Sequence, residues 1–60
     1  MTNKLVIIDH ICDKKGNVHY MVPGIIVKDH IEYHNSATVL VTYITHKEIY
    51  INAKKIVSYL

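Results

Sequence analysis

The 60-residue sequence contains no Trp, Phe or Arg, a single Cys and only two Gly. One Cys cannot close an intramolecular disulfide, so no covalent cross-link supplements the core. Two glycines are too few for the glycine-rich loops that hold nucleotide phosphates. No apolar run approaches the roughly 20 residues of a membrane-spanning helix, and the first residues lack the pattern of a signal peptide. These absences predict a cytoplasmic protein that does not cross a membrane.

β-branched residues dominate what is present, since Ile and Val supply 17 of the 60 positions whereas Leu supplies three and Ala two. Such side chains are stiff about χ1 and suit the pleated surface of a sheet. A chain this short forms one domain and buries only about 60% of the surface of its unfolded state, which leaves a small net stability. The composition therefore predicts a single all-β domain over residues 1–60.

Short apolar segments separated by turn residues predict five or six strands. The first two form a hairpin. Pro23 and Gly24 are expected to interrupt its second strand and to make the chain bend or bulge there, because Pro lacks a donor for the ladder and Gly loosens the backbone. The predicted elements are strands over residues 5–12, 18–22, 25–34, 37–44, 48–52 and 56–60, a turn over residues 13–17, and a turn of 3₁₀ helix over residues 53–55 capped by Asn52.

So many strands in so short a chain fit a small, bent sheet and not a two-sheet sandwich. The pattern from Gly24 to Leu60 resembles the core of small SH3-like barrels, and most of all that of the Sm-like RNA-binding proteins. The features that carry the resemblance are a glycine near the start of a bent strand, a turn Asn, an apolar strand, a strand with Tyr and an apolar last strand, here Gly24, Asn35, residues 39–41, Tyr50 and residues 56–60. The number and length of the strands predict an all-β fold, either a small five-stranded SH3-like barrel or a strongly bent antiparallel sheet, with an open sheet that buries its exposed face in a dimer as the alternative to closure.

Two parts of the sequence depart from the Sm-like pattern. The chain begins with a predicted hairpin where that family begins with a helix, and residues 51–53 replace the basic-His signature before the last strand. Residues 47–52 are also similar to a stretch of the small carbon-storage-regulator RNA-binding dimers, although the glycine-rich N-terminal pattern of that family is absent. Both resemblances imply RNA binding as the alternative function.

Five His residues and one Cys raise the question of a metal site or a catalytic site. His10 and Cys12 would share one face of the first strand. His30, Glu32 and His34 would share one face of the third. Neighbours two apart along a strand are roughly 6.5–7 Å apart, which is too far to hold one ion easily. No Cys or His spacing typical of zinc sites is present. We therefore predict no metal site and no cofactor.

Cys12 lies close to Asp9 and Asp13, whose negative charges disfavour the reactive thiolate. We expect it to be a small buried side chain and not a nucleophile. Adjacent Asp and His residues, such as Asp9 and His10, are expected to point to opposite faces of a strand and so not to act together. The sequence thus predicts no catalytic residue, and the protein is not expected to be an enzyme.

The net charge is +2 and all seven basic residues other than His are Lys. The two Lys pairs that could contact phosphates are Lys14–Lys15 and Lys54–Lys55. Arg, which reads guanine edges and phosphates through a planar fork, is absent. A few Lys contacts give only weak, salt-sensitive binding, so nucleic-acid binding ranks second among the expected functions.

All five aromatic residues are Tyr, a residue that suits half-buried places at interfaces. The predicted protein interface consists of Tyr33, Tyr43, Tyr50, Tyr59, Leu40, Ile44 and Leu60. The surplus of apolar side chains, together with an apolar last strand that would form a sheet edge, predicts a protein partner and association into homo-oligomers. Small chains rich in Lys, Ile, Asn and Tyr and without Arg resemble products of AT-rich Gram-positive bacteria and their phages. The expected function is therefore stoichiometric protein binding, as an inhibitor of a host enzyme or as an adaptor.

Overall fold

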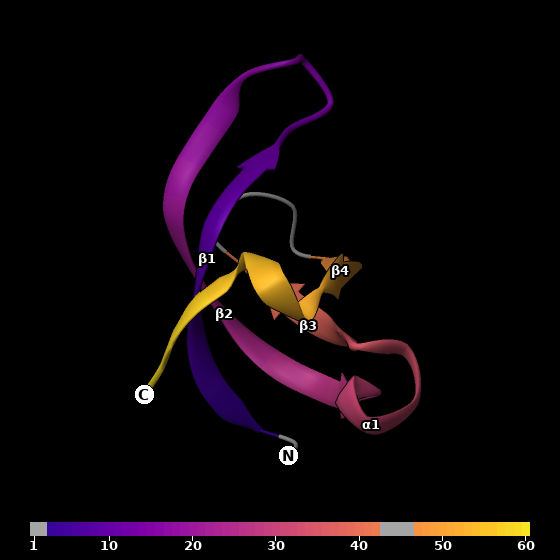
Figure 1. Cartoon of the computed structure of the whole chain (residues 1–60). Coiled ribbons are helices and arrows are strands. Elements are labelled where there is room, and N and C mark those ends of the chain that lie inside the picture. The colour runs from indigo at the N-terminus through magenta and orange to yellow at the C-terminus, as the bar shows by residue number, and fades with distance from the viewer. Residues whose placement is uncertain (1–2, 43–46) are drawn as a thin grey trace.

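The computed structural model of the protein describes residues 3–42 and 47–60. Most of these residues belong to one antiparallel sheet with the strand order β4-β3-β2-β1-β5. The elements are, in chain order, β1 (Lys4–Cys12), β2 (Val18–Asp29), α1 (Ile31–His34), β3 (Ser36–Val41), β4 (Lys47–Asn52), the 3₁₀ turn η1 (Ala53–Lys55) and β5 (Ile56–Tyr59). The prediction of an all-β fold with five antiparallel strands is confirmed. The sheet is open, and β4 and β5 form its two edges (Figure 1).

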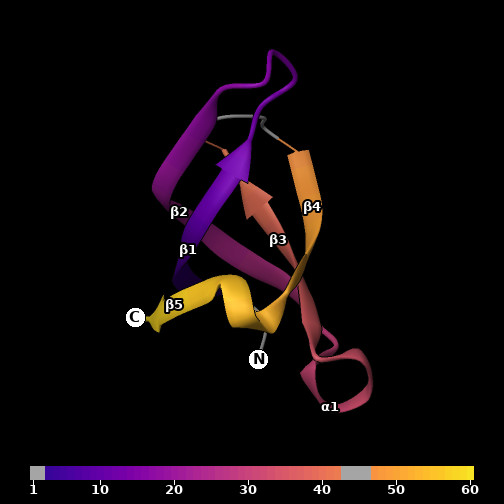
Figure 2. The same cartoon turned by 45° about the horizontal axis from the view of Figure 1, so that its top comes forward.

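The connection between β4 and β5 shows how strongly the sheet is bent. In a flat sheet the outer two of five strands would lie about 19 Å apart. The chain passes from Asn52 at the end of β4 to Ile56 at the start of β5 through the three residues of η1, and a stretch of this length spans at most about 14 Å. The sheet must therefore curl so that its opposite edges approach each other, and Figure 2 shows η1 and β5 crossing below the curled strands.

β1 and β2 continue beyond the other strands as a two-stranded projection, the arm, formed by residues 9–12 and 18–22 (Figures 1 and 2). β5 pairs with β1 only over residues 6–8, and β3 pairs with β2 only from Ile25 onward. The turn at the tip of the arm is held by Asp13, whose carboxylate accepts the backbone N–H groups of Lys15 at 2.8 Å and Asn17 at 2.9 Å. Gly16 adopts a φ of +86°, which an L-residue rarely takes. The predicted turn over residues 13–17 is confirmed.

The expected break at Pro23 and Gly24 is wrong, because β2 runs through both residues without interruption. Pro23 lies opposite Ile7 of β1, and on its other side β3 begins to pair with β2 only at Ile25. The Leu60 N–H donates to the Leu5 carbonyl at 2.9 Å, so the backbone polar groups of Leu5 point towards β5. Every second residue of a strand points its backbone polar groups to the same side, so those of Ile7 also point towards β5 and not towards Pro23. Pro23 therefore directs its nitrogen away from β1, to the side on which none of the described residues is paired with it, and its missing N–H removes no hydrogen bond to β1.

The predicted third strand ends too late in the sequence, because β2 stops at Asp29 and residues 31–34 form the single helical turn α1. The Asp29 carboxylate accepts the Ile31 N–H at 2.9 Å and so starts the turn. Asn35 ends it in the left-handed conformation, with φ 50° and ψ 44°, and donates its N–H to the Ile31 carbonyl. These local hydrogen bonds offer the backbone an alternative to the ladder, which the alternation of polar and apolar residues does not reveal.

The C-terminal elements match the sequence closely. β4 begins one residue before the predicted strand and ends at Asn52 as predicted, and the Asn52 side chain caps η1 by accepting the Lys54 N–H at 2.9 Å. β5 ends one residue before the predicted strand. β3 begins one residue before the predicted fourth strand and extends to Val41, and residues 43–44 of that predicted strand lie outside the described residues.

The core fills the concave, inner face of the bent sheet almost entirely with β-branched side chains. Val6, Ile8, Val39 and Val41 have no more than a trace of exposed surface. The other core residues are Ile11, Val22, Ile26, Ala37, Ile51 and Ile56, with Ile49 packed against them. On β4 the alternation follows the prediction, because Ile49 and Ile51 point inward and Tyr50 points outward. Ten of the 17 Ile and Val residues thus belong to the core or pack against it.

Candidate functional site

Four apolar residues, three from the adjacent strands β1, β2 and β3 and one directly after β5, lie side by side on the convex, outer face of the sheet. Leu5 of β1 is paired with Ile25 of β2, and Ile25 is paired with Leu40 of β3. The register between β1 and β5 places Leu60 opposite Leu5, and the Leu60 N–H donates to the Leu5 carbonyl. Residues directly opposite each other in a sheet project their side chains from the same face. Leu60, Leu5, Ile25 and Leu40 therefore form one continuous apolar stripe, here called the outer row.

Most of the outer row is open to solvent. The exposed fractions are 64% for Leu60, 44% for Leu5 and 39% for Ile25, and Leu40 is half-buried. A single exposed apolar residue is ordinary, but a contiguous apolar patch on a small protein marks an interaction surface.

More apolar surface borders the outer row on one side. Ile7 of β1 and Pro23 of β2 form the next outward-facing pair, and Met21, which is 59% exposed, continues this surface along β2.

Polar and aromatic residues border the outer row at its β4 end. Glu48 of β4 is paired with Leu40, and the next outward-facing cross-strand set consists of Lys28, Thr38 and Tyr50. An apolar centre with a polar rim and a tyrosine at its margin is the usual composition of a protein–protein interface. The arrangement supplies contact area and no reactive group.

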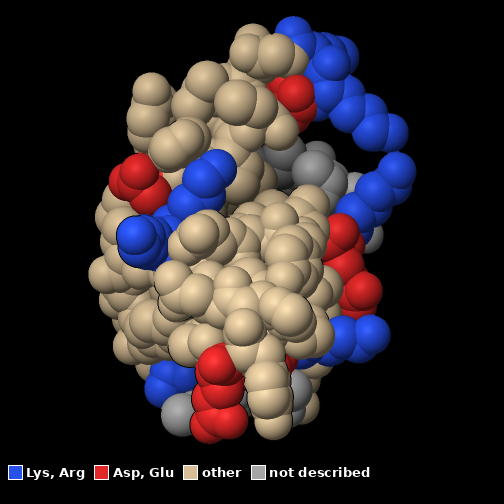
Figure 3. Space-filling model, turned by 45° about the vertical axis from the view of Figure 1, so that its right-hand side comes forward, with Lys and Arg blue, Asp and Glu red and all other residues tan. Residues whose placement is uncertain are grey.

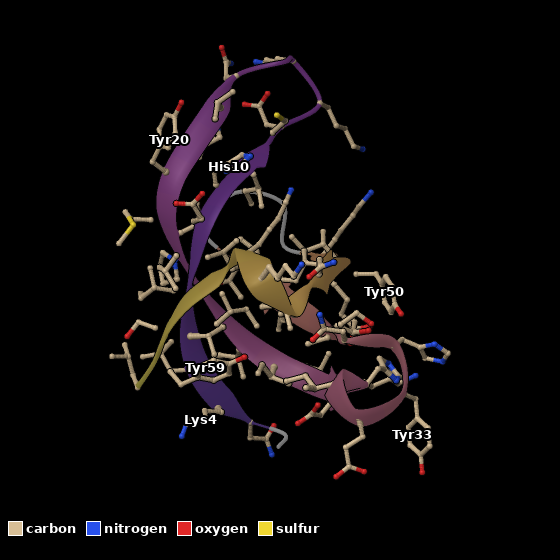
Figure 4. All side chains as sticks on the ribbon, viewed as in Figure 1. Lys4, His10, Tyr20, Tyr33, Tyr50 and Tyr59 are labelled. Carbon is tan, nitrogen blue, oxygen red and sulfur yellow. The ribbon has the colours of Figure 1, made fainter. Side chains whose placement is uncertain are left out.

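The predicted interface residues do not all gather on this surface. Leu40 and Leu60 belong to the outer row, and Tyr50 stands beside it. Tyr33 is 84% exposed on α1, and Tyr59 is paired with the buried Val6 at the β5 edge. Figure 4 shows Tyr33 and Tyr50 at the same end of the molecule and Tyr20 on the far side of β2. Tyr43 and Ile44 lie outside the described residues.

The sequence prediction missed Leu5 and Ile25, the two central residues of the outer row. A signal for Leu5 was present, because residues 5–8 read Leu-Val-Ile-Ile and leave both faces of the strand apolar. An apolar residue on the second face of an antiparallel strand needs a cover or a partner. Ile25 could not be placed, because its neighbours depend on the strand order and the register.

Tyr50 anchors a cluster where β4 meets α1. The hydroxyl of Ser36, which is almost wholly buried, donates to the Tyr50 hydroxyl. The Tyr50 ring packs against the His30 ring with their centroids 5.8 Å apart, and the His30 and His34 rings are 6.4 Å apart. An open surface hollow lies beside this cluster and is lined by Asp29, Ile31, Glu32 and Tyr33. The strand predicted over residues 25–34 would not have brought His30 and His34 together.

The tip of the arm carries a polar cluster around Asp13. The Nε2 atom of His19 lies 3.0 Å from the Asp13 carboxylate. This hydrogen bond, followed by the one from the Asn17 backbone N–H, lowers the pKa of Asp13 from 3.8 to about 2. The cluster provides acceptors for the backbone N–H groups of the turn. Its contact with solvent is more typical of structural capping than of acid–base chemistry.

Asp9 and His10 touch, contrary to the expectation that adjacent residues point apart. The His10 Nδ1 atom is 3.0 Å from the Asp9 carboxylate. The buried residues of β1 are two positions apart at Val6 and Ile8, but the next one, Ile11, comes three positions later. On β2, opposite this change of spacing, Met21 has a φ of +53°. This kink places Asp9 and His10 on the same side of the strand.

The prediction of a buried Cys12 is also wrong, because its thiol is free and exposed near the tip of the arm.

The two Lys pairs lie on different elements of the fold. Lys14 and Lys15 belong to the tip of the arm, whereas Lys54 and Lys55 belong to η1 at the other end of the sheet. In Figure 3, Lys side chains at the upper right adjoin one another, and acidic side chains and uncharged surface separate this group from the other Lys side chains in view. The positive charge on this side is therefore interrupted by acidic residues and does not form a track along the whole face.

Among residues 3–42 and 47–60, no three His, Cys, Asp or Glu side chains come close enough to hold a metal ion together. The same part of the chain contains no helix of the length and apolarity that crossing a membrane requires.

Comparisons of the chain with protein-family models, with curated proteins and with solved structures found no match.

Proposed function

We propose that the protein is a non-enzymatic binding module that acts stoichiometrically on another protein, as an inhibitor or an adaptor, through its outer row. The observation that carries this proposal is the alignment of Leu60, which follows β5, with Leu5, Ile25 and Leu40 of three adjacent strands on the solvent-facing side of the sheet. Maintaining this stripe in water costs free energy that a partner would recover by covering it.

The size of the molecule sets the extent of such an interface. A stable interface covers about 800 Å² of each partner, and the chain has a total accessible surface of 4206 Å². A partner would therefore cover about one fifth of the surface. The outer row would form the centre of the contact, and Ile7, Pro23 and Tyr50 would extend it on both sides.

A protein partner is favoured over a nucleic acid for two reasons. The exposed stripe is apolar, whereas a nucleic-acid surface needs clustered positive charge. The two Lys pairs lie on different parts of the fold and are accompanied by Asp13 at the arm. We also propose that the fold is related to that of the SH3-like and Sm-like barrels. The bent strand that contains Gly24 and the short apolar last strand support this relation.

A pair of matched variants tests the outer row. Leu5 and Val18 are both 44% exposed strand residues, but Leu5 is in the outer row and Val18 is on the arm. We expect immobilised wild-type protein and the Val18→Lys variant to retain the same host protein in a one-to-one ratio, and Leu5→Lys to lose it. Retention of that protein by Leu5→Lys would contradict the proposal. Binding of mixed oligonucleotides that weakens steeply with salt, and that is lost on Lys14→Glu and Lys54→Glu, would favour the alternative.

Self-association is the second part of the proposed binding behaviour. The same apolar stripe that would receive a partner can be covered by a second copy of the chain in the absence of that partner. We expect light scattering of the wild type to give a mass above the 6.9 kDa of one chain, and Leu5→Lys to shift it towards the monomer. A wild type that remains monomeric at high concentration would exclude the homo-oligomer.

A further inference from the structure

His30 and His34 lie one helical turn apart at the edge of the sheet. The His34 N–H donates to the His30 carbonyl at 2.8 Å, and the Tyr33 N–H donates to the same carbonyl at 3.1 Å. Residues four apart on a helical turn project from one side, one above the other. The two imidazole centroids are accordingly 6.4 Å apart, with their planes inclined by 58°. In an extended strand the same two residues would be about 13 Å apart.

The turn that presents the two imidazoles is anchored to the sheet at both ends. At its start, the Asp29 carboxylate accepts the Ile31 N–H. At its end, the Asn35 carbonyl accepts the Ala53 N–H of η1 at 2.9 Å. From the side, the Tyr50 ring packs against His30, and the Tyr50 hydroxyl is held by Ser36. A fixed backbone lowers the entropy that a ligand must overcome to order its site.

The pair offers two imidazole nitrogen atoms as ligands. Neither imidazole is hydrogen-bonded to another of the described residues. Imidazole nitrogen suits zinc, copper and nickel, and two His four apart on one helical face are a recurrent way of holding zinc. Two nitrogens bound to one zinc ion are at most about 4 Å apart, because each lies about 2.1 Å from the metal. Binding of one ion to both rings therefore requires the two side chains to rotate towards each other from their present centroid distance of 6.4 Å.

The geometry points to a two-histidine site, formed by His30 and His34, for a divalent transition metal of the zinc, copper or nickel class. Glu32 is two residues from each His and projects from the other side of the turn, so it does not join the pair. Because no set of three ligand side chains exists among the described residues, the protein supplies two positions and leaves the others to water or to a group on a bound molecule.

The test titrates the full chain with zinc sulfate in isothermal calorimetry. Removing a residue that only hydrogen-bonds to a metal ligand costs about 10–100-fold in metal affinity, so removing a ligand itself is expected to cost at least about tenfold. We expect the wild type to bind one Zn²⁺ per chain and His34→Gln to bind at least about tenfold more weakly. The matched control is His10→Gln, which changes another solvent-accessible histidine on the arm and should leave the affinity unchanged.

A second measurement identifies the ligands without any substitution. Added in small amounts, Ni²⁺ or Cu²⁺ should broaden the ring signals of His30 and His34 in the NMR spectrum of the wild type before those of the other histidines. The proposal is overturned if His34→Gln binds Zn²⁺ as tightly as the wild type, if the wild type binds none, or if the first signals to broaden belong to other histidines. Circular dichroism of His34→Gln shows whether the variant keeps the strand signal.

Discussion

Gly24→Ala is the substitution whose effect the structure determines most directly. Gly24 lies in the middle of β2, paired with Val6, and its backbone is not in the left-handed region. A Cβ atom there would lie 2.5 Å from Cγ1 of Val39, 3.3 Å from the Leu40 carbonyl oxygen and 3.5 Å from Cδ1 of Ile8. Val39 is fully buried and β-branched, so it cannot rotate away into space. The added methyl group must therefore push β2 and β3 apart.

Two opposing effects decide the size of the change. Replacing Gly with Ala stabilises a protein by about 0.4–1 kcal/mol where the native backbone suits Ala, because it restricts the unfolded chain. Overpacking a core costs about 1–3 kcal/mol. We expect the clash to win and the free energy of unfolding to fall by about 1–2 kcal/mol. For a 60-residue chain the whole stability is about 3–9 kcal/mol, so the loss is a large part of it.

Urea unfolding followed by far-UV circular dichroism measures this loss, and a double-mutant cycle with Val39→Ala identifies its cause. Val39→Ala removes the methyl group that the new Cβ would strike. In that background Gly24→Ala should be within about 0.5 kcal/mol of neutral. Sulfate in the buffer keeps all four proteins folded during the comparison. Equal losses of stability in both backgrounds, or a stabilised Gly24→Ala single variant, would refute the close packing of the Val39 side chain against Gly24.

Three further outcomes follow from local contacts. Asn35→Ala should lower the free energy of unfolding by about 1 kcal/mol because Asn35 has a φ of 50°, whereas Asn35→Gly should be nearly neutral in the same urea titration. Tyr50→Phe and Ser36→Ala should each cost about 1 kcal/mol but add less than fully in the double variant, since they break the same hydrogen bond. Asp13 has its pKa lowered to about 2 in the folded state, against 3.8 when unfolded, so its contribution is complete above about pH 4 and is lost as the pH falls towards 2. The stability gap between wild type and Asp13→Asn should therefore close over that interval, and a gap that persists at pH 2 would contradict the role of the His19 hydrogen bond.

Turns and alternating strands could be predicted because their causes are local. Gly16 and Asp13 supply the positive φ and the side-chain acceptor that a tight turn needs, and Asn52 supplies the cap of η1. In β4 the period of two assigns Ile49 and Ile51 to the core and Tyr50 to the outside. Each of these features depends on residues within a few positions of one another, so one sequence suffices to recognise it.

The errors arose where a local pattern and the tertiary arrangement disagree. Pro23 reads as a strand breaker, but β2 tolerates it because the β3 partner begins only at Ile25. Residues 31–34 alternate like a strand, but the side chain of Asp29 and the left-handed Asn35 close them into α1. Asp9 and His10 should diverge, but the kink opposite Met21 turns them to one side. In each case the missing information was the position of a partner strand or of a side-chain acceptor.

The sequence by itself determined that the protein is built of strands, because 17 Ile and Val residues and well-placed turn residues act through local stereochemistry. It also excluded a disulfide and a glycine-rich phosphate loop, since those need residues that are absent. Only the tertiary structure decided which residues are neighbours on the outer face and at α1. Leu60, Leu5, Ile25 and Leu40 are far apart in the chain, and strand order and register bring them together. A binding surface on a sheet is a property of that pairing, and pairing is set by long-range contacts that no short segment encodes.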